Sequence, residues 1–155
     1  TNSRIVWGVQ NKFESLSMNE FEIQGDGTRG YLSSNDSVII LSQGCGPSCT
    51  YAVVLPLNSS NDKRIELPQA IDIRKNLICY LPLEYKDSVF LIVENYLTGK
   101  KIFLKETNLC SAKFKGECLE CCFFDGNYLV LKWQGVKWKS WGKQDLQIKR
   151  IKIEM

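Results

Sequence analysis

The stretch LSQGCGPSCTYAVVL, residues Leu41–Leu55, decides the fold class of this chain. Two apolar runs flank a short loop that contains Gly46 and Pro47 and that Cys45 and Cys49 close. Short apolar runs on both sides of such turn residues are typical of the two strands of a β-hairpin. The stretch therefore predicts a hairpin with a rigid tip, and the two cysteines raise the question of a disulfide, a metal site or redox chemistry.

The same strand signal recurs along the whole chain, in short runs rich in β-branched and aromatic residues that end at turn residues. The predicted strands are Arg4–Val9, Ser37–Gln43, Thr50–Leu57, Leu77–Leu83, Ser88–Glu94, Lys100–Glu106, Cys118–Phe124, Tyr128–Gln134 and Leu146–Glu154. Hairpin turns are predicted at Asp125–Asn127 and at Asn95–Lys101, because a glycine in each accepts a positive φ. The only helix candidate, Asn11–Phe21, is too short and is expected to be a loop or a single turn.

A faint internal repeat links three of these segments. NDSVIIL (Asn35–Leu41) matches KDSVFLI (Lys86–Ile92), and DGNYLVL (Asp125–Leu131) is a looser third copy. Repeats of a turn followed by an antiparallel meander are typical of propeller blades, although short hairpins also resemble one another by chance. The expected fold is all-β, an antiparallel meander or sandwich with propeller-like repeated hairpin units, in a single domain over residues 1–155.

Three kinds of chemistry compete for the seven cysteines of the chain. Cys45 with Cys49, and Cys118 with Cys121, have spacings that resemble the halves of a four-thiolate zinc site. Cys121 nevertheless continues into Cys122 within a predicted strand, where alternation points neighbours to opposite faces. Redox catalysis by a C-x-x-C motif would need the motif to stand at the start of a helix, which lowers the thiol pKa. The motif Cys118–Cys121 lies in a predicted strand and has no such helix.

Structural disulfides are the expectation that remains best supported by the residues. The expected pairs are Cys45 with Cys49, and Cys110 with either Cys118 or Cys121; an odd number of cysteines leaves one thiol unpaired. No metal and no cofactor is expected. The chain begins at Thr1 with a polar stretch, which is compatible with a removed leader and equally with a cytosolic protein whose cysteines are buried free thiols. Together with the cysteine content, this predicts a periplasmic or secreted protein.

No catalytic constellation is apparent, and the chain is expected not to be an enzyme. Histidine, the commonest general base, is absent. Most Asp residues sit at turns, where backbone hydrogen bonding explains them. The segment Gln24–Gly30 is glycine-rich but lacks the features of a phosphate-binding loop. No apolar run approaches the roughly 20 residues that a membrane span needs.

Binding of a protein partner is the leading functional expectation, because rigid tips and aromatic anchors commonly carry interface energy. The candidate partner-binding residues are Gly44, Gly46, Pro47, Ser48, Asp26, Arg29, Trp138 and Trp141. The alternative is a module that binds polyanions or nucleic acid through the Trp/Lys-rich C-terminal third, by charge and stacking. A strand whose lysines face water while its tryptophans cover the core explains the same pattern, and nucleic acid is the less expected partner because the net charge is only +3.

The segments GCGPSCTYAVVLPLN (Gly44–Asn58) and LPLEYKDSVFLIVENYLTGKKI (Leu81–Ile102) resemble small exported bacterial proteins. In this group a cysteine-bounded loop precedes a strand, and a later Y-x-D-S stretch precedes a strand and a TGK turn. The pattern, which covers residues 38–133, is similar to periplasmic immunity proteins that neutralise cell-wall amidase effectors of the type VI secretion system. The resemblance implies an all-β periplasmic inhibitor whose loop plugs the groove of a cysteine peptidase. No residue matches a functional motif of that family closely enough to inherit a role.

Overall fold

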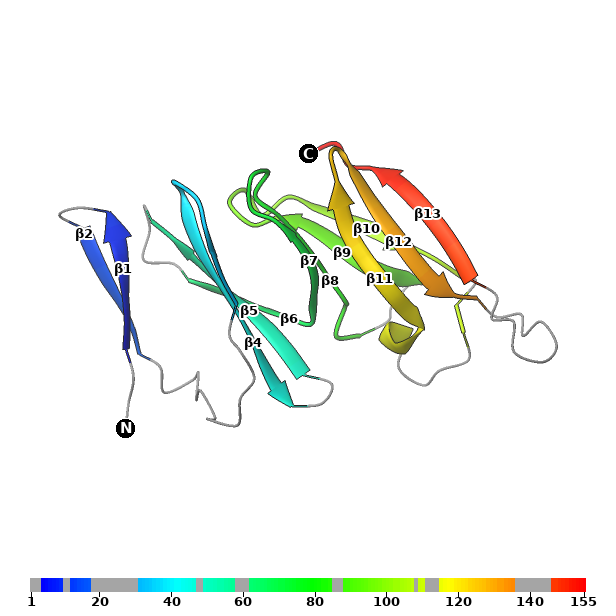
Figure 1. The fold of residues 1–155 in the computed structure, drawn as a ribbon, viewed down its shortest axis with the longest axis horizontal. Coiled ribbons are helices and arrows are strands. Elements are labelled where there is room, and N and C mark those ends of the chain that lie inside the picture. Colours follow the sequence, from blue (N-terminus) through cyan, green and yellow to red (C-terminus); the bar gives the residue numbers. More distant parts are fainter. Residues whose placement is uncertain are drawn as a thin grey trace. The chain divides into compact units, whose positions relative to one another are not determined.

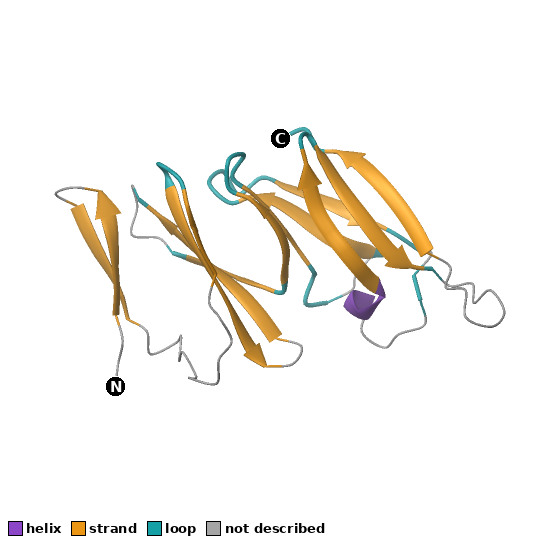
Figure 2. Ribbon diagram, in the orientation of Figure 1, coloured by secondary structure: helices purple, strands orange, loops and turns teal. Residues whose placement is uncertain are grey.

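A computed structural model of the protein describes residues 4–9, 12–17, 31–46, 49–57, 62–84, 88–107, 109–110, 115–135 and 146–155. The chain divides into two compact units, Thr1–Leu67 and Pro68–Met155, and Figure 1 labels most of their strands. Most of the described residues are in antiparallel strands, and one 3-10 helix, η2 (Lys115–Cys118), is the only helix among them (Figure 2). The all-β prediction is confirmed, whereas a single domain over residues 1–155 stays a prediction.

A hairpin opens the first unit. Strands β1 (Arg4–Val9) and β2 (Lys12–Ser17) pair in antiparallel register, from Arg4 opposite Ser17 to Val9 opposite Lys12. The expectation of a loop or single turn at Asn11–Phe21 is therefore wrong over β2. Lys and Glu are depleted in strands, so the composition of β2 carries little strand signal. The ladder with β1 supplies the backbone hydrogen bonds that favour the strand.

A four-stranded antiparallel meander follows in the same unit. Its strands are β3 (Tyr31–Ser34), β4 (Val38–Gly46), β5 (Cys49–Pro56) and β6 (Lys63–Glu66), and they neighbour one another in chain order. The side chain of Asn35 initiates β4, because its Oδ1 accepts the backbone N–H groups of Ser37 at 2.8 Å and Val38 at 3.0 Å. The hairpin expected within Leu41–Leu55 is thus present as β4 and β5.

The apolar side chains of β5 form the core of this sheet. Tyr51, Val53 and Leu55 are buried and pack with Ile39 and Leu41. The register explains this contact, because Ile39 lies opposite Leu55 and Leu41 opposite Val53, on the same face of the sheet.

Two antiparallel meanders build the second unit. The first sheet contains, in chain order, β7 (Pro68–Asp72), β8 (Leu77–Tyr80), β9 (Val89–Asn95) and β10 (Lys101–Lys105). The second sheet contains β11 (Leu119–Asp125), β12 (Tyr128–Gln134) and β13 (Leu146–Lys152). Both expected glycine turns are present: Gly99 has φ +73° between β9 and β10, and Gly126 has φ +55° between β11 and β12.

The two sheets of the second unit contact each other through their inner faces. Phe90 of β9 lies against Trp133 of β12, with ring centroids 6.2 Å apart. Cys79 of β8 meets Cys122 of β11 at 3.6 Å between sulfur atoms. The ammonium of Lys75, in the β7–β8 turn, donates to Asn127 Oδ1 at 2.7 Å and to the Gly126 carbonyl in the β11–β12 turn. The described part of this unit is therefore a sandwich of two meanders, as expected.

The repeated sequence segments occupy β4, β9 and β12. In chain order β4 and β12 are the second strands of their sheets, whereas β9 is the third strand of its sheet. The first and third copies of the repeat thus occupy matching positions, and the middle copy does not. Among the described residues, no helix has the length and apolarity that a membrane crossing requires.

Candidate functional site

The outer face of the β11–β12–β13 sheet is the candidate site. Along β12, Leu129, Leu131 and Trp133 point inward and are at most 4% exposed, while the alternate residues lie nearer to solvent. The register brings the outward residues of all three strands together. The outer face consists of Glu120, Cys121, Phe123, Asp125, Tyr128, Val130, Lys132, Gln134, Leu146, Ile148, Arg150 and Lys152.

Apolar side chains form the centre of the outer face. Phe123 lies opposite Val130, and Ile148 lies opposite Lys132, one row further along. Phe123 is 49% exposed, Ile148 72% and Leu146 42%. Single exposed apolar residues are ordinary, but a group that shares one rigid face indicates a surface for interaction.

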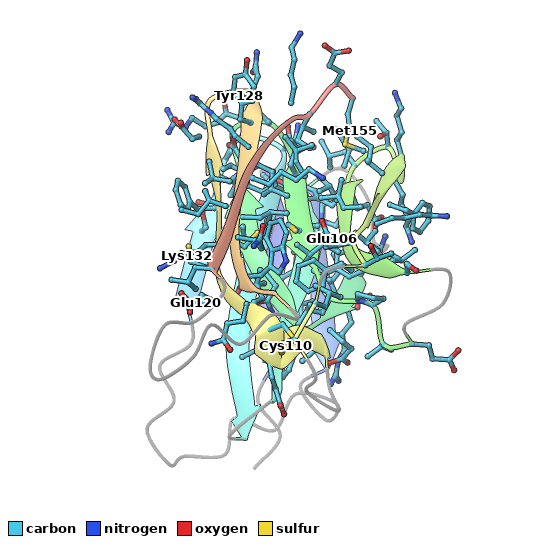
Figure 3. The ribbon with its side chains drawn as sticks, turned by 90° about the vertical axis from the view of Figure 1, so that its right-hand side faces the viewer. Glu106, Cys110, Glu120, Tyr128, Lys132 and Met155 are labelled. Carbon is cyan, nitrogen blue, oxygen red and sulfur yellow. A yellow bond between two sulfur atoms is a disulfide. The ribbon has the colours of Figure 1, made fainter. Side chains whose placement is uncertain are left out.

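A β-bulge brings two consecutive residues of β11 to this face. The register of β11 on β12 shifts between Leu119 and Cys121, so that Glu120 is the extra residue. Glu120 Oε2 lies 2.9 Å from Lys132 Nζ, and Gln134 Nε2 donates to Glu120 Oε1 at 3.4 Å. Figure 3 shows Glu120 and Lys132 side by side on the sheet. Cys121, the next residue, lies opposite Lys132 and is exposed.

Electrostatics at the bulge favours the ionised pair. The hydrogen bond from Lys132 lowers the pKa of the Glu120 carboxyl below its usual value, although desolvation acts in the opposite direction. The same hydrogen bond and the negative charge of Glu120 raise the pKa of Lys132. Both side chains are therefore charged near neutral pH and neutralise each other.

Two further ion pairs flank the apolar centre. The Arg150 guanidinium lies 2.7 Å from Asp125 Oδ2 and 4.3 Å from the ring centroid of Tyr128. Lys152 Nζ lies 2.5 Å from Glu154 Oε1. Each cation of the outer face thus has a carboxylate beside it. This surface therefore combines exposed apolar side chains with charged side chains that neutralise one another, and Lys132 lies on the central strand between Cys121 and Ile148.

A disulfide between Cys110 and Cys118 fixes the chain just before β11. The Cys110 N–H also donates to the Gln134 carbonyl at 2.9 Å, which ties this segment to the end of β12. The first of the two expected pairings of Cys110 is therefore present, while Cys121 is a free thiol. A disulfide-bonded Cys118 holds no thiolate for zinc, so the four-thiolate alternative lacks one of its ligands.

Most of the predicted partner-binding residues lie outside the described part of the chain. These are Pro47, Ser48, Asp26, Arg29, Trp138 and Trp141. Gly44 and Gly46 lie in β4 rather than in a loop, opposite Thr50 and Cys49, with a shift of register between the two glycines. The side chains of Cys45 and Cys49 also lie outside the described residues, so their disulfide and the role of this tip stay predictions.

The sequence reasoning missed Phe123, Val130 and Ile148, the apolar centre of the outer face. The alternation of Tyr128–Gln134 could have placed Val130 on the outer face, because it puts Trp133 on the inner face and Lys132 on the outer face. Trp133 is buried and thus not available to stack on a base, which agrees with the interpretation that this tryptophan covers the core.

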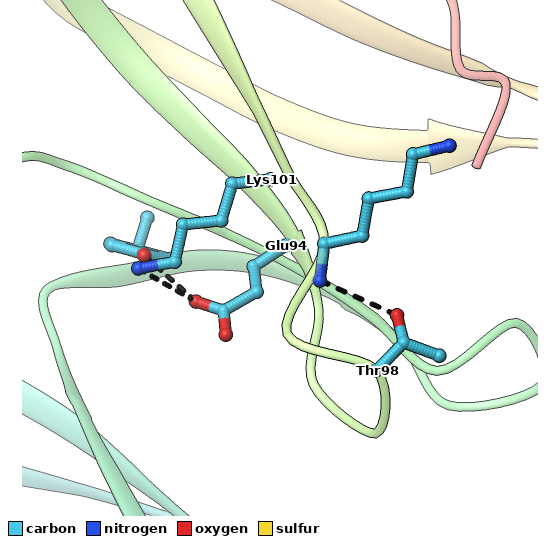
Figure 4. Close-up of polar contacts among 5 residues, drawn as sticks. Glu94, Thr98 and Lys101 are labelled. Atoms are coloured by element: carbon cyan, nitrogen blue, oxygen red, sulfur yellow. Dashed lines mark hydrogen bonds and ion pairs between the residues drawn. The ribbon is translucent and has the colours of Figure 1, made fainter.

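A second charged group lies on β9. The Glu94 carboxylate is fully buried, accepts a hydrogen bond from the Tyr80 hydroxyl at 2.9 Å and lies 3.6 Å from Lys101 Nζ (Figure 4). Burial, and then the hydrogen bond to Glu94, raise the pKa of Tyr80 well above its usual value. Buried polar groups that satisfy one another in this way stabilise a fold, and this cluster therefore has a structural explanation.

No group of three or more His, Cys, Asp or Glu side chains in the described segments could hold a metal ion. Comparison with known proteins adds no assignment: no family model, no curated protein and no solved structure matches this chain.

Proposed function

We propose that this protein is a non-enzymatic binding protein that recognises a protein partner through the outer face of its β11–β12–β13 sheet. The observation that carries the proposal is the apolar centre on a paired sheet rather than on a loop, where Phe123 and Ile148 are exposed and Val130 is half-buried. Side chains on paired strands lose little conformational freedom on binding, which favours affinity. Aromatic anchors within a polar rim commonly carry most of the binding energy.

The proposed partner is a hydrolase of the bacterial cell envelope, which this protein would inhibit. The class of partner comes from the resemblance of Gly44–Asn58 and Leu81–Ile102 to immunity proteins for cell-wall amidases. The Cys110–Cys118 disulfide supports a periplasmic or secreted location, because disulfides persist in oxidising compartments. Non-enzymatic action is supported by the carboxylates Glu120 and Asp125, which are each bound to a cation and are not poised as free bases.

Polyanion binding, the alternative function, finds less support on this surface. Lys132, Arg150 and Lys152 each have a carboxylate neighbour, so an incoming phosphate would compete with an existing ion pair. Trp133 is on the inner face.

The test is co-purification with, and inhibition of, the hydrolases that neighbouring genes encode. The wild type is compared with Phe123→Ser/Ile148→Ser and with Phe103→Ser, which also removes an exposed phenylalanine but from β10. We expect one hydrolase to bind and lose activity with the wild type and with Phe103→Ser, and to escape the double variant. Equal inhibition by all three proteins would reject the outer face as the binding surface. No binding or inhibition of any neighbouring hydrolase would reject the inhibitor function.

A further inference from the structure

The free thiols of Cys79 and Cys122 form a pair between the two sheets of the second unit. Their sulfur atoms lie 3.6 Å apart, although 43 positions separate the residues in sequence. Cys79 lies on β8 opposite Val93, and Cys122 lies on β11 opposite Leu131, so each thiol points from an inner strand face toward the other sheet. A disulfide needs a separation of about 2.05 Å, which leaves an approach of only about 1.5 Å for side-chain rotation and small strand shifts.

The two thiols differ in access to solvent. Cys79 is fully buried, whereas Cys122 is partly exposed. A hydrogen bond with Cys122, followed by burial, raises the pKa of Cys79 well above its usual value, so this thiol is protonated near neutral pH. An external disulfide can therefore reach Cys122 and not Cys79.

We propose that Cys79 and Cys122 form a second, reversible disulfide, made by thiol–disulfide exchange with a small-molecule disulfide such as oxidised glutathione. The Cys122 thiolate attacks one sulfur of the small disulfide, forms a mixed disulfide and expels one thiolate. The Cys79 sulfur then attacks the Cys122 sulfur, its proton passes to the departing thiolate, and a second small thiol leaves. Two protein thiols are oxidised and one small disulfide is reduced to two thiols.

The neighbouring cysteines support this assignment. Cys110 and Cys118 already form a disulfide directly before β11, so the chain carries one bond of the same kind four residues from Cys122. Cys121 is exposed on the outer face, where alternation and the bulge direct it away from Cys79. Oxidation would leave Cys121 as the free thiol among the cysteines whose side chains the structure describes.

The consequence is a covalent bond between the two sheets. It would join β8 to β11, the strand that also carries Phe123, and close a much longer loop than the Cys110–Cys118 bond does. Longer loops lose more freedom in the unfolded chain. The unfolding midpoint of the protein should therefore rise when this pair is oxidised and fall when it alone is reduced.

The experiment uses the full chain in glutathione buffers of graded redox potential, with an alkylating quench under denaturing conditions and peptide mapping by mass spectrometry. We expect a peptide pair linked through Cys79 and Cys122 to accumulate as oxidised glutathione increases, while Cys121 is alkylated. The Cys110–Cys118 disulfide is the internal control, because its presence in the same samples shows that the buffer does not reduce existing disulfides.

Three variants separate the roles of the thiols. Cys79→Ser should trap glutathione on Cys122, Cys122→Ser should leave Cys79 unmodified, and the matched control Cys121→Ser should still form the Cys79–Cys122 link. The proposal is overturned if the wild type has Cys79 and Cys122 alkylated at every potential at which Cys110–Cys118 stays oxidised. It is equally overturned if Cys79 links to Cys121. The wild-type result decides the question even where a variant does not fold.

Discussion

The guanidinium of Arg150 lies 4.3 Å from the ring centroid of Tyr128 while it bonds Asp125 Oδ2 at 2.7 Å. The three residues come from neighbouring positions on β13, β12 and the end of β11, and together they form one edge of the outer face. A guanidinium on an aromatic ring is held in place by packing as well as by charge. This edge is therefore an ordered rim beside the apolar centre. Substitutions at the rim and at the centre can be compared to measure how much each contributes to binding.

The first prediction is a large difference between rim and centre. Arg150→Ala should weaken binding of the hydrolase partner by less than about fivefold, because exposed ion pairs contribute roughly 1 kcal/mol or less. Phe123→Ser should weaken binding by about thirtyfold or more, the effect of losing roughly 2 kcal/mol at a hot spot. Titration calorimetry with the purified partner measures both. A larger loss for Arg150→Ala than for Phe123→Ser would show that charge, and not the apolar centre, carries recognition.

The second prediction concerns the polyanion alternative. Because Lys132 and Arg150 are engaged by carboxylates, the wild type should leave a heparin column below roughly 0.2 M salt, where several phosphate contacts would already be strongly weakened. Glu120→Gln/Asp125→Asn, which frees both cations, should elute later. Retention of the wild type to high salt, abolished by Trp138→Ala/Trp141→Ala, would instead establish the Trp/Lys-rich third as the binding element.

The third prediction is that the Cys110–Cys118 disulfide stabilises the second unit. The bond closes a short loop with a sequence separation of 8, for which the chain-entropy relation gives roughly 2.5 kcal/mol. Cys110→Ala/Cys118→Ala should lower the free energy of unfolding by about this amount in urea titrations. Cys121→Ser is the matched control and should change it by less than about 0.5 kcal/mol, because that thiol is exposed. An equal loss in the control would mean that the effect is not due to the bond.

The sequence predicted the strands wherever several apolar or aromatic residues stand between turn residues. The prediction Tyr128–Gln134 coincides with β12, and Arg4–Val9 coincides with β1. It missed β3 and β7, which are short strands at the edges of their sheets. An edge strand is paired on one side only and needs no continuous apolar run, so its existence depends on the neighbour more than on its own residues.

The candidate site was less accessible to sequence reasoning. Interleaved Lys and Trp residues drew attention to the segment that contains Lys132, but only the register shows that Lys132 meets Glu120 and Ile148 across the sheet. Alternation correctly separated Cys121 from Cys122. The partner of Cys122 could not be predicted, because Cys79 is distant in sequence and is brought near by the contact of two sheets.

The fourth prediction concerns alkaline pH and the hydrogen bond between Tyr80 and Glu94. Tyr80→Phe should lower the free energy of unfolding by about 1.5–3 kcal/mol at pH 7, because the buried Glu94 carboxylate loses a donor. The folded protein holds the pKa of Tyr80 well above its value in the unfolded chain, which is about 10. The unfolded chain therefore binds fewer protons than the folded protein above about pH 10, and the contribution of Tyr80 to stability falls as pH rises.

The measurement is a set of urea titrations of wild type and Tyr80→Phe between about pH 8 and pH 11, across the pKa of an unperturbed tyrosine. The difference in the free energy of unfolding between wild type and Tyr80→Phe should be constant below about pH 9.5 and should shrink above about pH 10. In the wild type, Tyr80 loses its proton more readily in the unfolded chain than in the folded protein, which favours unfolding, and the variant lacks this effect. Tyr96→Phe should show the same sign, since burial also raises the pKa of Tyr96. A difference that stays constant to pH 11 would show that Tyr80 ionises equally in both states, and that its hydroxyl is not committed to Glu94.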